Sequence, residues 1–182
     1  MRNVQSRVID APPSTVGTLI DTLAGPDDRL WPTDTWPAIK FDRGLAVGST
    51  GGHGPIRYYV SAYEPGKRVR FTFTPETGIQ GYHELRVEPI GPATTRLVHE
   101  GVGRTFGRTR LTWPLAVRWL HEALIQDLLD NAQREATGRP ANPRRWSPWV
   151  RLLRRVAGQP RQPRVDLGEV APQIGRHSND FS

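Results

Sequence analysis

The chain has 182 residues, a formal net charge of +7 and no cysteine. This length fits one domain with a tail better than two full domains. The absence of cysteine excludes disulfides, iron–sulfur clusters, thiolate metal sites and a cysteine nucleophile. The first residues lack the apolar block of a signal peptide, and the apolar stretch 113–117 is too short to cross a bilayer. We therefore expect a soluble, cytoplasmic protein.

The positive charge is concentrated at one end of the chain. Residues 1–138 hold 16 Lys and Arg against 15 Asp and Glu, whereas residues 139–182 hold 9 Arg against three acidic residues. This shift predicts a domain over 1–138 and an Arg- and Pro-rich tail over 139–182. The pI of 10.7 is therefore a property of the tail. It gives no reason to expect a nucleic-acid-binding function for the whole chain.

The N-terminal segment predicts a strand followed by a helix. Residues 4–9 have the composition of a strand, and a Pro-Pro pair at 12–13 is well placed at the start of a helix. Apolar residues then recur at helical spacing from Val16 to Leu23, before the stop signal Gly25-Pro26. Residues 27–38 are predicted to form a short helix or an ordered loop.

The middle of the chain changes to a period of two. Strands are predicted at 41–47, 56–63, 68–74, 79–87 and 94–105, with a turn over the Gly-rich residues 48–55. Turns of hairpin length favour an antiparallel arrangement. Residues 111–136 then predict one long helix that ends at Gly138. The order of elements predicts an α+β fold in which a long helix packs on a curved antiparallel sheet.

Strand alternation and helix periodicity turn four polar side chains inward: Tyr58, His83, His99 and His121. Polar groups that converge among apolar ones are typical of a ligand pocket. The alternative is that each is a core residue with a satisfied hydrogen bond, and a one-residue slip would move a histidine to the other face. The predicted ligand-binding residues are Tyr58, Val60, Phe71, Phe73, His83, Leu85, Leu97, His99, Trp113, Val117, Leu120, His121 and Leu124.

The sequence offers little support for other kinds of active site. It has no zinc-binding His pair, no Gly-x-Ser-x-Gly and no complete nucleotide-binding motif. We expect no metal and no nucleotide cofactor. Acid–base chemistry by Tyr58, His83, His99 and His121 is one alternative, because imidazole can accept a proton from a carbon acid. Ligand binding without chemistry is the other.

Three stretches resemble the START-like superfamily, also called SRPBCC. They are the junction 8–16 (VIDAPPSTV), the hairpin regions 44–49 (GLAVGS) and 63–71 (YEPGKRVRF), and the long helix 111–136. The resemblance is closest to the bacterial polyketide cyclase/dehydrase and lipid-transport group. Gly17 departs from the pattern, since relatives commonly carry an aromatic residue there, and the first helix is therefore expected to pack differently.

This resemblance implies a helix-grip fold, in which the long helix closes a curved sheet over a hydrophobic cavity. It implies binding or transport of a small hydrophobic ligand such as a lipid, a sterol or a polyketide. The alternative it implies is a cyclase or dehydratase that uses pocket His and Tyr residues. Fold alone cannot choose between them.

The tail contains a candidate amphipathic helix at about 147–157, with Ser147 as cap and Pro148 in its first turn. Three alternatives stay open: the helix docks on its own domain, contacts an anionic membrane, or contacts an acidic partner such as RNA. The chain after Gln159 is predicted to be disordered. The residues predicted to contact a membrane or acidic partner are Arg144, Arg145, Trp146, Trp149, Arg151, Arg154 and Arg155.

Overall fold

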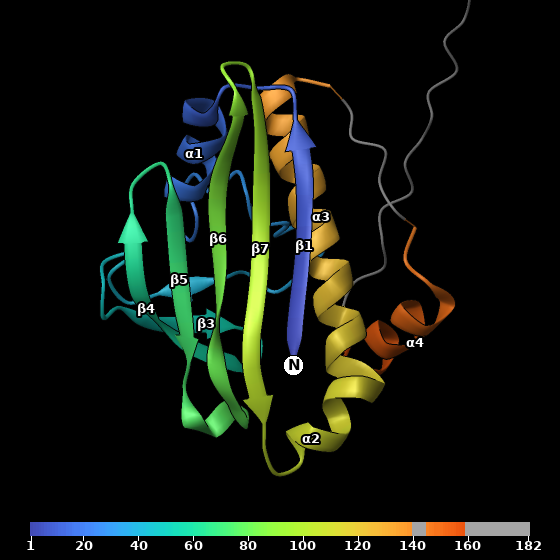
Figure 1. Ribbon diagram of the computed structural model, residues 1–182. Helices are drawn as coiled ribbons and strands as arrows, with labels where there is room; N and C mark the ends of the chain where they lie inside the picture. The colour runs from blue at the N-terminus through green and yellow to red at the C-terminus, as the bar shows by residue number, and fades with distance from the viewer. Residues whose placement is uncertain (140–144, 159–182) are drawn as a thin grey trace, which may run out of the picture.

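The computed structural model describes residues 1–139 and 145–158, so Arg144 and the segment after Gln159 lie outside the described residues. Seven antiparallel strands form one sheet in the order β1-β7-β6-β5-β4-β3-β2 (Figure 1). The strands are β1 (Arg2–Ile9), β2 (Lys40–Phe41), β3 (Thr50–His53), β4 (Ile56–Glu64), β5 (Arg68–Phe73), β6 (Ile79–Gly91) and β7 (Thr94–Thr105).

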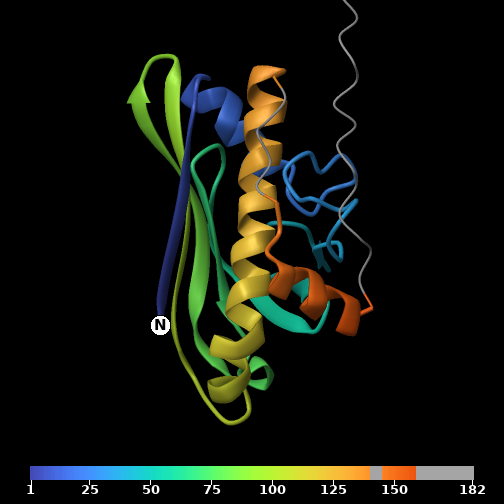
Figure 2. The same cartoon turned by 90° about the vertical axis from the view of Figure 1, so that its right-hand side faces the viewer.

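The long helix α3 (Arg118–Thr137) lies across one face of this curved sheet, so that the two form two layers (Figure 2). The other helical segments are α1 (Pro13–Asp21), the 3-10 turn η1 (Pro75–Thr77), α2 (Thr109–Thr112), the π-helical turn η2 (Trp113–Val117) and α4 (Pro148–Val156). This is the α+β helix-grip architecture predicted from the order of elements. In the described residues, no helix is long and apolar enough to span a bilayer.

The core lies between the sheet, α1 and α3. It joins Leu19 and Ile20 of α1, Val60 and Phe71 of the sheet, and Leu128 of α3, all at most 2% exposed. Burying side chains of this size contributes about 1.5–3 kcal/mol each to the free energy of folding. The packing of α1 and α3 on the sheet is therefore the main source of stability.

Gly17 allows α1 to pack closely on the turn between β4 and β5. A Cβ atom at this position would lie 2.1 Å from the carbonyl oxygen of Gly66. Because this oxygen belongs to the backbone, it cannot move aside without displacing the turn. Asp21 holds the same turn by accepting hydrogen bonds from Tyr63 and from the backbone N–H of Gly66. The glycine that departs from the resemblance is therefore required by this close approach.

The segment 40–55 differs from the prediction. The expected strand 41–47 is reduced to Lys40–Phe41, and β3 occupies residues 50–53, where a turn was predicted. Asp42 explains the first difference, since it accepts hydrogen bonds from Ser49 and Thr50 and so folds 42–49 into a loop. Glycines in β3 explain the second, because Gly52 adopts a φ of +149° and leaves no space for a Cβ next to Ile56.

The predicted helix 111–136 is present, but it starts two residues earlier and contains a π-helical turn at Trp113–Val117. Pro114 lies in that turn and has no N–H to donate to a regular helical ladder. The carbonyl of Pro114 instead accepts a hydrogen bond from the indole of Trp119. The long helix is thus irregular at its N-terminal end.

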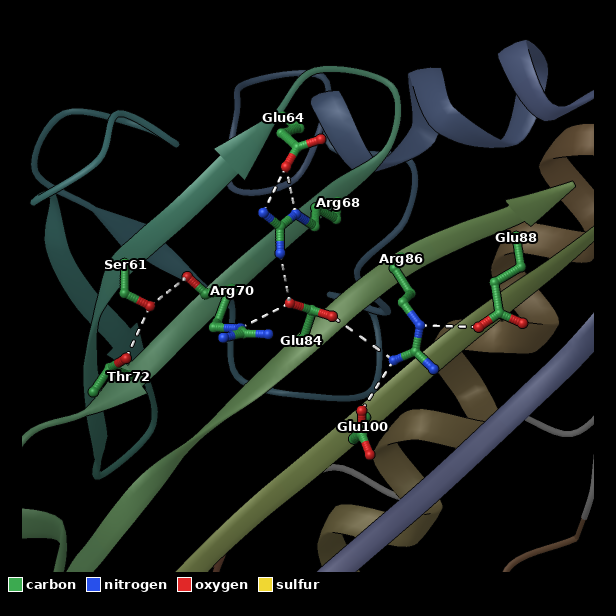
Figure 3. A network of polar contacts seen from close by, with 9 residues as sticks. All are labelled: Ser61, Glu64, Arg68, Arg70, Thr72, Glu84, Arg86, Glu88 and Glu100. Carbon is green, nitrogen blue, oxygen red and sulfur yellow. Dashed lines mark hydrogen bonds and ion pairs between the residues drawn. The ribbon is translucent and has the colours of Figure 1, made fainter.

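The outer face of the sheet carries a network of arginines and glutamates (Figure 3). At its centre Glu84 is only 4% exposed, although it points away from the core. Its carboxylate lies 2.8 Å from Arg70 and 3.7 Å from each of Arg68 and Arg86. Arg86 continues the network to Glu100 at 3.1 Å. The buried carboxylate of Glu84 therefore has three arginine partners within the described residues.

Candidate functional site

The inner face of the sheet holds a row of aromatic and imidazole rings. The ring of Tyr58 on β4 lies 4.8 Å from that of His83 on β6, which lies 5.7 Å from His99 on β7. His121 of α3 follows at 5.0 Å from His99. The structure thus brings together the four polar residues that the sequence predicted to converge.

His53 joins this row, although the sequence pattern did not predict it. Its Nδ1 lies 2.8 Å from the hydroxyl of Tyr58, and its ring lies 4.9 Å from that of Trp31. His53 was placed in the predicted turn 48–55, where facing directions are undefined. In β3, Gly51 pairs with Tyr58, so Gly51 and His53 share the inner face with Tyr58. Recognising that short strand would have revealed the fourth histidine.

An internal cavity lies between these rings and α3. It leaves about 20 Å³ in which the centre of a water molecule can move, whereas one water requires roughly 10–15 Å³ of such space. In this conformation the cavity therefore has room for about one water molecule. Its lining residues are Leu23, Trp31, His53, Phe71, His83, Leu85, His99, His121, Leu124, Ile125 and Leu128.

Several imidazole nitrogens around this cavity have no hydrogen-bond partner in residues 1–139 and 145–158: Nε2 of His83, both nitrogens of His99, and Nδ1 of His121. Burial lowers the pKa of His53 to about 3 and that of His121 to about 4. Burial also lowers the pKa of His83 and His99 well below the ordinary value. All four rings are therefore neutral at physiological pH, and each offers one donor and one acceptor.

The predicted ligand-binding residues divide into two groups. Those that line the cavity are Phe71, His83, Leu85, His99, His121 and Leu124. Those outside its lining are Tyr58, Val60, Phe73, Leu97, Trp113, Val117 and Leu120. Phe73 and Trp113 nevertheless touch the row of rings, because Phe73 stacks on His83 at 5.1 Å and Trp113 lies 6.2 Å from His121. The lining residues Leu23, Trp31, Ile125 and Leu128 were not predicted.

The histidines do not form a metal site in this conformation. In the part of the chain that the structure describes, no group of three or more His, Asp or Glu side chains is arranged to hold a metal ion. The row instead consists of rings in contact with one another, at centroid separations that are typical of aromatic packing.

The helix α4 docks on its own domain. Ser147 caps it by accepting a hydrogen bond from the backbone N–H of Val150. The indoles of Trp36 and Trp146 both donate to Asp127 of α3, at 2.7 and 3.0 Å. Burial raises the pKa of Asp127 to about 6. Figure 2 shows α4 against α3 on the side away from the sheet.

Arg154 completes this contact from α4. Its guanidinium lies between the rings of Trp36 and Trp146, 4.1 and 4.0 Å from their centres, and donates to the carbonyl of Thr35. Trp146 and Arg154, which were predicted to face an external partner, are therefore buried. Arg145, Trp149, Arg151 and Arg155 stay exposed. The sequence predicted that α4 is an amphipathic helix, but the side that docks is the one bearing Val150 and Arg154.

The fold resembles several solved structures. A protein from Nitrosospira multiformis superposes with a TM-score of 0.57 at 18% identity, over 75% of this chain and 97% of that one. CalU16 from Micromonospora echinospora gives 0.54 at 19%, over 86% and 83%. Norcoclaurine synthase from Thalictrum flavum, in complex with dopamine and hydroxybenzaldehyde, gives 0.54 at 12%, over 71% and 83%.

At these identities the likeness shows the fold alone. No protein-family model matches the sequence, and a search of the curated proteins finds no match either. The helix-grip fold is thus supported both by the architecture and by these structures. The function has to be argued from the residues of the cavity.

Proposed function

We propose that the protein binds a small, largely apolar ligand with hydrogen-bonding groups in the cavity between the sheet and α3. The observation that carries this proposal is the set of unpaired, buried nitrogens on His83, His99 and His121. An unpaired polar atom in a core costs about 1–3 kcal/mol, so a group kept there without a partner calls for a functional reason. A ligand that hydrogen-bonds to the imidazoles supplies that reason.

The size of the cavity constrains how such a ligand enters. Space for about one water cannot hold a lipid, a sterol or a polyketide, for which pockets of about 300–1,000 Å³ are usual. The cavity must therefore expand on binding. The irregular segment α2–η2 is the part best suited to move, since none of its residues is buried. We infer that this segment swings away from the sheet to admit the ligand.

Superfamily membership belongs to the same proposal. The order of motifs resembles the START-like superfamily, and the norcoclaurine synthase structure with a similar fold holds dopamine and hydroxybenzaldehyde. Aromatic compounds with hydroxyl or carbonyl groups fit the chemistry of this cavity, because Phe71 and Trp31 can pack on their rings and the imidazoles can bond their oxygens.

Acid–base catalysis, as in a cyclase or dehydratase, is the second candidate. The free imidazole nitrogens favour it, since they could accept a proton from a bound carbon acid. The pKa of about 4 for His121 speaks against it, because an efficient general base has a pKa near the working pH. Binding without chemistry is therefore the function we place first.

Titration calorimetry and native mass spectrometry with dopamine, 4-hydroxybenzaldehyde and oleate test this function. At least one probe should bind, and His83→Leu and His99→Leu should weaken that binding about tenfold, the loss of one hydrogen bond. Tyr82→Phe, on the outer face, is the matched control and should bind as wild type. Failure of all three probes to bind, or binding by the two Leu variants as tight as that of wild type, would contradict the proposal.

The same probes separate binding from catalysis. His83→Gln and His121→Gln should abolish turnover if catalysis occurs and change only affinity if it does not.

A further inference from the structure

Two neighbouring helical segments present large apolar side chains to solvent. On the first, Leu111 is 71% exposed and Leu115 is 64% exposed. On α4, Leu152 is 47% exposed and Val156 is 81% exposed. Side chains of this size in adjacent segments are unusual on a free surface, and such patches mark interaction sites.

A hydrogen bond joins the two segments into one surface. The indole of Trp149 on α4 donates a hydrogen bond to the carbonyl of Leu115 at 2.9 Å. Trp149 itself is 45% exposed. Leu111 and Leu115 are one turn apart, as are Trp149 and Leu152, so each pair lies on one side of its helix. We call Leu111, Leu115, Trp149, Leu152 and Val156 the apolar patch.

The two stretches of chain that carry the apolar patch have charges of one sign. Residues 101–121 contain four arginines and no acidic residue, and residues 145–158 contain four arginines and no acidic residue. Arg118 pairs with Glu122, and Arg154 is buried in the docking contact of α4. Arg108, Arg110, Arg151 and Arg155 are exposed, and within residues 1–139 and 145–158 they make no ion pair.

We propose that this surface, the apolar patch with its four arginines, docks on an anionic lipid bilayer. Exposed Trp and Leu side chains enter the region between headgroups and acyl chains, while arginines bind lipid phosphates. A protein partner with one acidic face would match the charge but would leave Val156 and Leu111 no apolar counterpart. A bilayer supplies both the negative surface and the apolar layer.

The surface includes the segment that lies next to the cavity. Leu111 and Leu115 belong to the same α2–η2 stretch as Trp113, whose ring reaches His121 beside the cavity. Contact with lipid at Leu115 would therefore act on the segment that has to move for the cavity to expand. The docking itself rests on exposure and charge and does not depend on the proposed function.

Flotation of the full chain with vesicles tests this inference. Vesicles of phosphatidylcholine with about 30% phosphatidylserine carry a negative surface potential and should bring the wild-type protein to the top of a sucrose gradient. Leu152→Glu with Val156→Glu should lower the bound fraction at least tenfold, and so should Leu115→Glu. Val4→Glu with Val8→Glu is the matched control, since Val4 and Val8 are 46% and 51% exposed on β1. This control should float as wild type.

Charge is tested separately. Arg151→Glu with Arg155→Glu should abolish flotation, and wild-type binding should fall as salt is raised, because ions screen the contact. Arg29→Glu with Lys67→Glu is the matched control. It changes the net charge by the same amount at exposed residues outside α2–η2 and α4, and it should retain binding. Circular dichroism confirms that each variant is folded.

Three results would overturn the inference. One is flotation that the apolar-patch variants do not change, which would indicate unspecific attraction. Another is flotation lost equally in both matched controls. The third is a dimer in light scattering that the Leu152 and Val156 variants dissociate while wild type fails to float, which would assign the apolar patch to a second copy of the chain. Loss of ligand binding with intact flotation would instead affect only the proposed function.

Discussion

The two faces of the sheet bury polar groups in opposite ways. On the outer face, Glu84 is surrounded by the three arginines Arg68, Arg70 and Arg86 (Figure 3). On the inner face, His83 and His99 are buried to a similar degree, yet Nε2 of His83 and both nitrogens of His99 have no hydrogen-bond partner in the described chain. Burial alone therefore does not mark a site. A buried polar group with partners avoids most of the cost of leaving water, whereas one without partners lowers the stability of the fold. Under the proposed function, the ligand supplies the missing partner.

The largest expected effect is a loss of stability in acid that comes from the inner face. The four cavity histidines have ordinary pKa values near 6.5 when unfolded, and burial lowers their pKa values in the folded state, to about 3 for His53 and about 4 for His121. Between these values the unfolded chain binds more protons, so stability is full above pH 6.5 and falls as the pH drops.

Each such histidine changes the free energy of unfolding by at most about 1.4 kcal/mol per pH unit. Asp127 opposes them, because its pKa, raised to about 6, adds stability as the pH falls through that value. From pH 7.5 to pH 5 we expect a net loss on the order of 5 kcal/mol, measured by urea unfolding. His121→Leu should make this dependence shallower, and a flat profile in the wild type would contradict neutral buried imidazoles.

A smaller loss is expected on the outer face. Glu84→Gln leaves three arginines without their shared carboxylate, and it should lower the free energy of unfolding by about 2 kcal/mol at neutral pH. The arginines are partly exposed and can turn to water, so the cost stays below that of a fully buried pair. Glu64→Gln, at the exposed rim of the same network, is the control and should cost less than about 1 kcal/mol.

The smallest expected effect is a gain in stability rather than a loss. His99→Leu replaces a buried ring with two unpaired nitrogens by an apolar side chain, and it should raise the free energy of unfolding by about 1 kcal/mol at pH 7.5. Thermal unfolding measures the change. A stabilised variant that no longer binds ligand would match the exchange of stability for function seen at many sites. A destabilised His99→Leu would mean that the ring has a structural role.

Prediction from the sequence succeeded where the pattern was local. The alternation in 68–74, 79–87 and 94–105 placed Phe71, His83 and His99 on one face, and the ring contacts agree. Prediction was wrong for 41–55, since the loop that Asp42 closes and the glycine-rich strand β3 depend on contacts with β4. That error concealed His53. It also shows why glycine-rich stretches are difficult: their conformation is decided by the partner strand.

Outside residues 40–55, the sequence alone determined the order of the main elements, the inward direction of three histidines and the presence of an amphipathic helix near residue 150, because periodicity fixes which side chains share a face. Only the tertiary structure decided how tightly the cavity closes, where His53 points and which side of α4 docks. Arg154 is the clearest case. Its burial requires two indoles, Trp36 and Trp146, that are far apart in the chain and meet only when α4 reaches Asp127.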